Sequence, residues 1–279
     1  MSAHIAVVTD STSCLPDQLA ARWGIGVVQV QLHAGDVTDD EHRFDRSQLI
    51  DAMKAGRPVS TSPPDPGAFF WTYQDAASSG ASAIVSMHIS GRLSDTVQAA
   101  REAAQQVRIP VHIIDSGTAS MSLGFASVSA ARVAGAGGQL ERVLEAAERR
   151  VRGSTELIYV DTLEYLRRTG RVGAAQSLLG NAFSIKPLLT VRNGEISPLA
   201  RVPGTKRAMN RLVELAVKAA GDRKVDLAIT RFGSDEREVV RRLKEEIPDV
   251  ADVIVGDAST VIGAHVGPGA MSITVSPVN

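Results

Sequence analysis

The first half of the chain repeats one pattern, in which a short apolar run rich in β-branched residues is followed by a stretch with helical periodicity. Four such runs stand at residues 4–8, 27–32, 83–89 and 111–116. Helical stretches follow or separate them, notably at residues 94–107 and 124–136. Short buried strands that alternate with helices form a mostly parallel sheet with helices on both faces. We therefore predict an α/β fold that begins with an α/β/α layer structure.

The pattern changes after a charged helical stretch that ends near residue 153. Six further runs read as strands, at residues 155–160, 184–191, 195–202, 225–230, 251–257 and 270–275. Asn193-Gly194 separates two of them, and this dipeptide is the strongest short-range signal for a β-hairpin. Two helices, near residues 205–220 and 234–247, are expected to cover this second sheet.

The length of the chain supports a division into two domains. At 279 residues, with 44% hydrophobic and 22% charged residues, the chain is long enough for two domains with cores of their own. We predict an N-terminal α/β/α domain with a mostly parallel sheet over residues 1–153. A C-terminal α/β domain with a six-strand mixed sheet is predicted over residues 154–279.

Hydroxyl-bearing segments follow the predicted strands of the first domain. They are DSTS at residues 10–13, ISGRLSDT at residues 89–96 and DSGTAS at residues 115–120. An open parallel sheet binds its ligands in the crevice outside the carboxyl ends of its strands. The sequence therefore predicts a ligand crevice lined by serine and threonine hydroxyls.

The overall charge argues against nucleic acid as a partner, because the net charge is -1 and the basic residues are spread along the chain. Cys14 is the single cysteine and cannot form an intrachain disulfide, and the first residues lack a signal-peptide pattern. No apolar run approaches the ~18 residues of a membrane span. We expect a soluble, cytoplasmic protein without stable membrane insertion and leave transient contact with a membrane open.

Familiar catalytic motifs are missing from the sequence. It has no P-loop, no G-x-S-x-G nucleophile elbow and no complete dinucleotide fingerprint. The six histidines are scattered, without a spacing suited to zinc. Residues 39–45, DDEHRFD, could hold a divalent ion, but a charge run of this kind usually lies in a solvated loop. We expect neither a metal ion nor a cofactor.

Seven segments together resemble the DegV family. They are DSTSCLP, TSPPDPGAFF, ISGRLSDTVQAA, DSGTAS, LEYLRRTGRVG, IKPLLTV and GAHVGPGA, in the family's order and spacing from residue 5 to about residue 275. Members of this family serve as fatty-acid-binding subunits of bacterial fatty acid kinase. The resemblance implies a parallel-sheet domain and a six-strand mixed-sheet domain. It also implies a long-chain fatty acid between or beneath them, with its carboxyl group at the domain junction.

The resemblance further implies which residues contact the ligand. The family's carboxylate-binding threonine, serine and histidine fall on Thr61, Ser94 and His265. An arginine near the head group and the face that docks the kinase falls on Arg171.

Two positions depart from the family pattern. Asp95 stands in place of the glycine that usually follows the serine, and its carboxylate could either cap a helix or repel the ligand's head group. Pro203 stands where the family tends to carry a second arginine, and Arg201 or Arg207 would have to substitute for it.

Each implied contact residue also has a purely structural interpretation. Thr61 and Ser94 precede predicted helices and could act as caps, although a helix N-terminus also attracts anions, so both roles are compatible. His265 lies among glycines and beside Pro268, and we expect a shaped loop there, flanked by two strands of the second domain. In that loop, His265 would donate a ring N–H to the ligand's carboxylate.

These observations favour a carrier over an enzyme. The chain lacks a nucleotide site, so a separate fatty acid kinase would phosphorylate the carboxylate with ATP and supply acyl phosphate to phospholipid metabolism. One alternative is a hydrolase or acyltransferase with Ser94 as nucleophile and His265 as base, although no third member of a triad can be assigned. A binding module for another apolar ligand is the second alternative.

Overall fold

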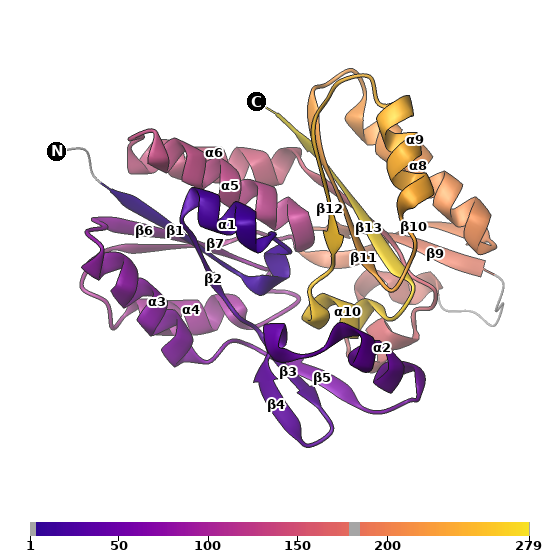
Figure 1. Cartoon of the computed structure of the whole chain (residues 1–279), viewed down its shortest axis with the longest axis horizontal. Coiled ribbons are helices and arrows are strands. Elements are labelled where there is room, and N and C mark those ends of the chain that lie inside the picture. The colour runs from indigo at the N-terminus through magenta and orange to yellow at the C-terminus, as the bar shows by residue number, and fades with distance from the viewer. Residues whose placement is uncertain (1–3, 179–184, 279) are drawn as a thin grey trace.

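Two large β-sheets lie side by side in the computed structural model, which describes residues 4–178 and 185–278 (Figure 1). The first sheet is built from β1 (Ile5–Asp10), β2 (Ile25–Val28), β6 (Ala83–His88) and β7 (Val111–Asp115). Its order is β2-β1-β6-β7, and every neighbouring pair is parallel. The predicted parallel sheet is therefore confirmed.

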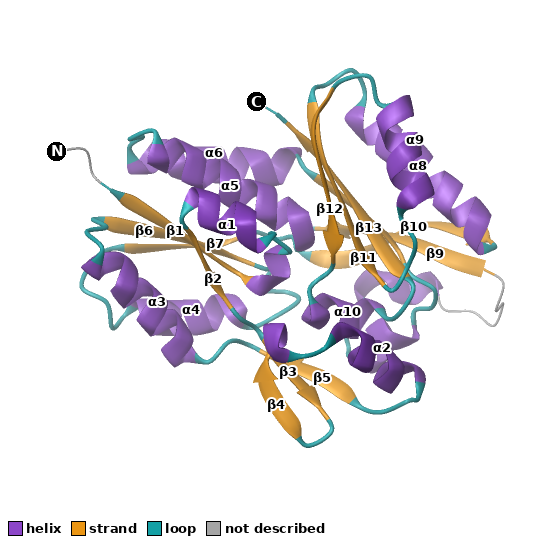
Figure 2. Cartoon of the chain, in the orientation of Figure 1, coloured by secondary structure: helices purple, strands orange, loops and turns teal. Residues whose placement is uncertain are grey.

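Helices cover both faces of the parallel sheet. They are α1 (Asp17–Trp23), α3 (Pro66–Ser78), α4 (Thr96–Ala104), α5 (Ser120–Gly135) and α6 (Leu140–Gly153). Successive side chains of a strand point to opposite faces, so Val7 packs with residues of α1, α5 and α6, whereas Val8 packs with residues of α3 and α4. Figure 2 shows the sheet between these two helical layers.

A small antiparallel sheet extends from the parallel one. Its strands are β3 (Gln31–Ala34), β4 (Val37–Asp40) and β5 (Val59–Ser62), in the order β4-β3-β5, and α2 (Arg46–Lys54) precedes β5. The prediction of one strand over residues 27–32 is therefore wrong, because β2 ends at Val28 and β3 begins at Gln31. Between them, the N–H of Val30 binds the Ser11 hydroxyl at 3.0 Å, so Val30 does not continue the parallel pairing.

The second large sheet has six described strands, β8 (Thr155–Tyr159), β9 (Ile185–Arg192), β10 (Glu195–Pro203), β11 (Val225–Phe232), β12 (Val250–Asp257) and β13 (Ala270–Pro277). Their order is β10-β9-β8-β13-β11-β12, and among them only β11 and β12 pair in parallel. Asn193 and Gly194 both have positive φ, 52° and 80°, as a tight hairpin turn requires. The predicted six-strand mixed sheet and its hairpin are confirmed.

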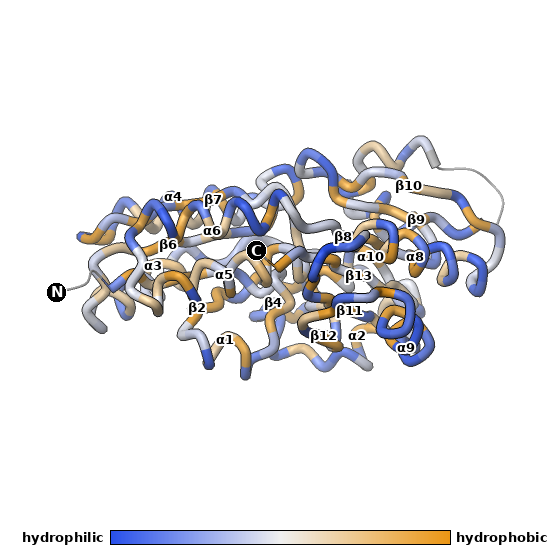
Figure 3. The backbone as a smooth tube through the Cα atoms, turned by 90° about the horizontal axis from the view of Figure 1, so that it is seen from above, coloured by the Kyte–Doolittle hydropathy of each residue, from blue (hydrophilic) through white to orange (hydrophobic). Residues whose placement is uncertain are grey.

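One face of this sheet is covered by α8 (Thr205–Ala220) and α9 (Arg237–Glu246). Leu157 and Tyr159 of β8 pack there with Leu212 and Leu243 of the two helices. Figure 3 shows hydrophilic and hydrophobic stretches alternating along α9, as expected for a helix with one face on a sheet.

The other face of the six-stranded sheet points toward the first half of the chain. It is covered by α7 (Glu164–Arg168), α10 (Thr260–Val266) and a 3-10 helix at Gly173–Leu178, and two further 3-10 helices lie at Ser11–Ser13 and Glu41–Arg43. Ile158 of β8 packs with Leu166 and Val266 on this side. Met121 of α5 packs against Ala228 of β11, so elements of both halves meet over this face.

The two large sheets are formed on either side of residue 154, since α6 ends at Gly153 and β8 begins at Thr155. The division into domains at residues 1–153 and 154–279 stays a prediction. Within the described ranges, no helix combines the length and the hydropathy that crossing a bilayer requires.

Candidate functional site

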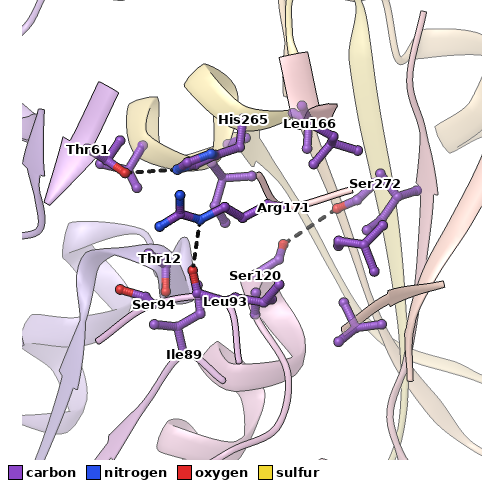
Figure 4. A pocket seen from close by; sticks show the side chains of 18 of the residues that line it. Thr12, Thr61, Ile89, Leu93, Ser94, Ser120, Leu166, Arg171, His265 and Ser272 are labelled. Atoms are coloured by element: carbon purple, nitrogen blue, oxygen red, sulfur yellow. Dashed lines mark hydrogen bonds between the residues drawn. The ribbon is translucent and has the colours of Figure 1, made fainter. Parts of the chain in front are cut away.

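A cavity of about 110 Å³ lies between the two large sheets. Most of its wall is apolar and includes Ile89, Leu93, Ile158, Leu166, Val191 and Phe232. Each hydroxyl-rich segment that follows a parallel strand contributes one hydroxyl-bearing residue, namely Thr12, Ser94 and Ser120. Thr61, Arg171 and His265 also line the cavity, so the fold brings together the four residues that the resemblance implied (Figure 4).

His265 belongs to a helix and not to the expected loop. It lies in the last turn of α10, which ends at Val266 and is capped by Gly267, where φ is 83°. The prediction of a loop is therefore wrong for this residue, although the flanking strands, β12 and β13, do belong to the six-stranded sheet. Close packing explains the glycine: a Cβ at Gly263 would lie 2.3 Å from the Phe232 ring, so only glycine lets α10 approach β11 this closely.

Side chains anchor the beginning of α10. The Ser259 hydroxyl accepts a hydrogen bond from the N–H of Ile262 at 3.1 Å, and the Glu41 carboxylate accepts from the N–H of Val261 at 2.9 Å. Glu41 is only 4% exposed, so the expectation that residues 39–45 form a solvated loop is wrong for this residue. Its burial is offset by the hydrogen bond that its Oε2 accepts from the free N–H at the helix start. No cluster of three or more metal-ligating side chains occurs in the described ranges.

Thr61 binds His265 directly. Thr61 lies in β5, and its Oγ1 is 2.9 Å from Nε2 of His265. The expectation that Thr61 caps a helix is wrong, because α3 begins after Asp65, whose carboxylate accepts from the N–H of Gly67. The β5 strand therefore positions a hydroxyl against the last turn of α10.

His265 is neutral at physiological pH. Burial, and then the positive charge of Arg171, lower the pKa of His265 to about 4. Nδ1 of the ring is buried and has no hydrogen-bond partner among the described residues. When Thr61 donates to Nε2, an Nδ1–H is left over, and when Nε2–H donates to Thr61, the hydroxyl proton is left over. In either tautomer the pair keeps one proton for a ligand.

Ser94 lies just before the start of α4. Its Oγ is 2.8 Å from the Thr96 hydroxyl and accepts a weak bond from the N–H of Thr96 at 3.4 Å. The capping residue itself is Asp95, whose side chain makes no capping hydrogen bond and is exposed at the edge of the cavity. The N-cap is therefore Asp95, whereas the sequence suggested Ser94. The Ser94 hydroxyl still lies at a helix N-terminus, where anions are favoured.

Arg171 lies between His265 on one side and Leu93 and Ser94 on the other (Figure 4). Its Nε donates to the carbonyl oxygen of Leu93 at 3.3 Å, and its Nη1 donates to that of Thr169 at 2.5 Å. These bonds orient the guanidinium but do not neutralise it, and within residues 4–178 and 185–278 no carboxylate forms an ion pair with it. A positive charge without an ionic partner therefore faces the polar end of the cavity.

The floor of the cavity carries a second group of polar residues, of which only Ser120 belongs to a segment that the sequence predicted to line a crevice. Glu156, Thr230 and Ser272 line the cavity from β8, β11 and β13, and Ser120 joins them from the start of α5. A carboxylate near the start of a mostly apolar strand run was the one signal that could have identified Glu156.

Comparison with known proteins identifies the family. The model of a family described as uncharacterised DegV proteins matches residues 4–278. The chain belongs to the DegV family. A DegV domain-containing protein of Streptomyces coelicolor is 42% identical over 279 residues, which cover 99% of each chain.

Solved DegV structures share the fold over their whole length. The DegV family protein of Thermus thermophilus, which binds fatty acid, has a TM-score of 0.91 at 32% identity, with 99% of this chain and 100% of that chain covered. DegV of Bacillus subtilis, a fatty acid binding protein, has a TM-score of 0.89 at 27% identity, with the same coverage. The two-sheet architecture is thus that of the DegV family.

Among the residues that the structure describes, none that lines the cavity substitutes for the second arginine expected from the DegV pattern. Pro203 ends β10, and neither Arg201 nor Arg207 lines the cavity. Arg168 pairs with Glu164 on an exposed face of α7 and is not a candidate either. Arg171 is the one arginine among the described residues that line the cavity.

The hydrolase alternative needs a hydrogen bond between Ser94 and His265. In this DegV chain, the Ser94 hydroxyl is bound to Thr96 and Nε2 of His265 is bound to Thr61. No hydrogen bond joins Ser94 to His265 among the described residues, so the geometry does not favour this alternative.

Proposed function

We propose that this chain binds a long-chain fatty acid in the cavity between its sheets, with the carboxylate at Thr61, Ser94, His265 and Arg171. The observation that carries the proposal is the combination of an apolar cavity with Arg171, a cation without an ionic partner in the described chain, at its polar end. The fatty acid binding described for the Thermus thermophilus and Bacillus subtilis relatives supports the same ligand class.

The apolar wall would supply most of the affinity. Burying a methylene group contributes about 0.8 kcal/mol, so a chain of roughly sixteen carbons gains on the order of 10 kcal/mol before ordering costs. The head group then needs only enough partners to offset its desolvation, which otherwise costs several kcal/mol. The Ser94 hydroxyl, one proton of the Thr61–His265 pair and the Arg171 guanidinium would meet that need.

The neutral state of His265 suits this role. A protonated imidazole beside Arg171 would add a second positive charge to one small site, and the low pKa of His265 avoids that repulsion. A neutral imidazole–hydroxyl pair still donates one hydrogen bond to a carboxylate oxygen. The bound head group would thus face one full positive charge and several neutral donors.

The bound acid would be presented to a separate kinase, as the resemblance implies. In that step, a carboxylate oxygen attacks the γ-phosphorus of ATP, a new O–P bond forms, the bond to the bridging β–γ oxygen breaks, and ADP leaves. The chain itself would hold and orient the acid in the cytoplasm, and the catalysis would belong to the fatty acid kinase.

Arg171→Ala tests this assignment. The variant should still take up labelled hexadecanoic acid, because most of the affinity is apolar, while acyl phosphate formation with the kinase catalytic subunit and ATP should fall about tenfold or more. His265→Ala should lower the same single-turnover rate by a factor on the order of ten to a thousand.

The matched control is Arg168→Ala, which removes a guanidinium that pairs with Glu164 on the surface of α7. This variant should retain both uptake and phosphorylation. Wild-type phosphorylation by Arg171→Ala would remove Arg171 from the site, and a wild-type rate from His265→Ala would leave His265 a structural residue.

A further inference from the structure

The polar floor of the cavity is a built cluster of one carboxyl group and several hydroxyls. Glu156 is 3% exposed, and Ser120, Thr230 and Ser272 are 5%, 4% and 9% exposed. The hydroxyls of Thr230 and Ser272 are 2.7 Å apart, and Ser120 lies 3.5 Å from each of them. Figure 4 shows Ser120 and Ser272 on the side of the cavity away from Thr61.

One carboxyl oxygen of Glu156 accepts two hydrogen bonds, and the other accepts none. Oε2 accepts hydrogen bonds from the Ser122 hydroxyl at 2.9 Å and from the Thr274 hydroxyl at 2.7 Å. Oε1 is buried and makes no hydrogen bond among the described residues, although the Ser120 and Ser272 hydroxyls lie near enough to lower the pKa of the carboxyl group. In the same part of the chain, no basic side chain forms an ion pair with Glu156.

The free oxygen needs a partner in either protonation state. Burial raises the pKa of Glu156, which favours the neutral acid. Since Oε2 already accepts two bonds, a proton on the carboxyl group belongs on Oε1, where it requires an acceptor. An ionised Oε1 would require a donor instead. A hydroxyl both donates and accepts, so it satisfies Oε1 in both states.

The floor is separated from the head-group site by apolar wall. Along β8, Glu156 and Ile158 lie on the same face of the sheet, two residues apart, and Ile158 packs with Leu166 and Val266. His265 adjoins Val266 on α10. An acyl chain with its carboxylate at His265 would therefore pass this apolar contact before it reaches Glu156.

We propose that Glu156, with Ser120, Thr230 and Ser272, forms a second polar subsite that binds a hydroxyl group carried on the acyl chain of the ligand. The ligand class is then a hydroxylated long-chain fatty acid. This inference rests on the proposed function and specifies its substrate. A plain methylene chain would leave Oε1 buried without a partner, and that loss disfavours the unsubstituted acid.

The test is a competition for the delipidated protein. Octadecanoic acid competes in turn with positional isomers of hydroxyoctadecanoic acid, and native mass spectrometry counts the bound species. One isomer, or two adjacent ones, should displace octadecanoic acid with a preference of about tenfold, the effect of satisfying one buried polar group. The other isomers should bind more weakly than octadecanoic acid, because their hydroxyls would lie against the apolar wall.

Variants connect the preference to the floor. Glu156→Met keeps the length of the side chain without its polar atoms, and the variant should bind octadecanoic acid but lose the preference. Thr230→Val, a nearly isosteric change, should reduce the preference and covers the case in which Glu156→Met does not fold. Thr190→Val is the control, because the Thr190 hydroxyl binds the carbonyl oxygen of Glu156 and does not line the cavity.

The other possible results would overturn the inference, the proposed function or both. Binding of octadecanoic acid with no preferred isomer, as expected if the floor holds only a water molecule, would overturn the inference and leave the proposed function intact. A preference that survives both floor variants would also overturn it. Failure of every acid to bind would overturn the proposed function and this inference together.

Discussion

At the scale of single residues, the buried imidazole of His265 makes stability depend on pH. The pKa of His265 is lowered from 6.5 to about 4 by burial and by Arg171. Between these values the unfolded chain binds a proton that the folded chain does not, so stability falls as the pH drops from about 6.5 toward 4. At about pH 5, which is about 1.5 units below the usual pKa of 6.5, the loss of stability is about 2 kcal/mol at most, because each unit contributes about 1.4 kcal/mol.

His265→Gln should remove this part of the pH dependence. The free energy of unfolding of the ligand-free protein, measured by urea denaturation at about pH 7.5 and about pH 5, should fall more in the wild type than in the variant. All other titrating groups are common to the two proteins, so their contribution cancels in the difference. Equal losses in the two proteins would mean that His265 titrates normally.

At the scale of elements, the position of α10 depends on the glycine that packs against β11. Gly263→Ala would place a methyl group 2.3 Å from the Phe232 ring, which is fully buried. Overpacking of this kind costs about 1–3 kcal/mol, and a shift of α10 would carry His265 away from Thr61. We expect lower stability by denaturation and weaker uptake of labelled hexadecanoic acid.

Gly135→Ala provides the comparison, because this glycine also lies in a helix, and a Cβ there would meet nothing within 4 Å. Alanine should leave the protein unchanged or stabilise it by up to about 1 kcal/mol, through its better helix propensity. If Gly263→Ala proved as stable as Gly135→Ala, the packing account of α10 would be wrong.

The elements that the sequence predicted are those whose signal is local. All six strands of the mixed sheet follow from runs of apolar residues, and the hairpin follows from the φ values that Asn193-Gly194 tolerates. The short strands β3, β4 and β5 lack such runs, and the helix around His265 looks like a loop because its small residues serve close packing. That requirement comes from Phe232, which is far away in the sequence.

In the candidate site, too, the sequence predicts only what a pattern of neighbouring residues carries. Thr61, Ser94, Arg171 and His265 could be named because a family pattern singles them out, and the structure does bring them to one cavity. The pairing of Thr61 with His265 joins β5 to α10 across 204 residues, and no local pattern contains it. The cluster around Glu156 combines three strands and a helix, so only the folded chain shows it.

At the scale of the whole molecule, the cavity is the place where the two halves of the chain meet. Its walls come from the parallel-sheet half, through residues such as Ile89, and from the six-stranded sheet, through residues such as Ile158. A ligand that fills the cavity would contact both halves at once. Ligand binding would therefore stabilise the folded chain by mass action, by about 2.7 kcal/mol at a concentration one hundred times the Kd.

The central claim, that this cavity holds a long-chain fatty acid, is tested most directly by identifying what the protein carries. Mass spectrometry of the small molecules extracted from the purified, natively folded protein should find about one long-chain fatty acid per chain, because an apolar ligand of this size would dissociate slowly. If the protein is instead purified empty and takes up no labelled long-chain acid, hydroxylated or not, the account is contradicted.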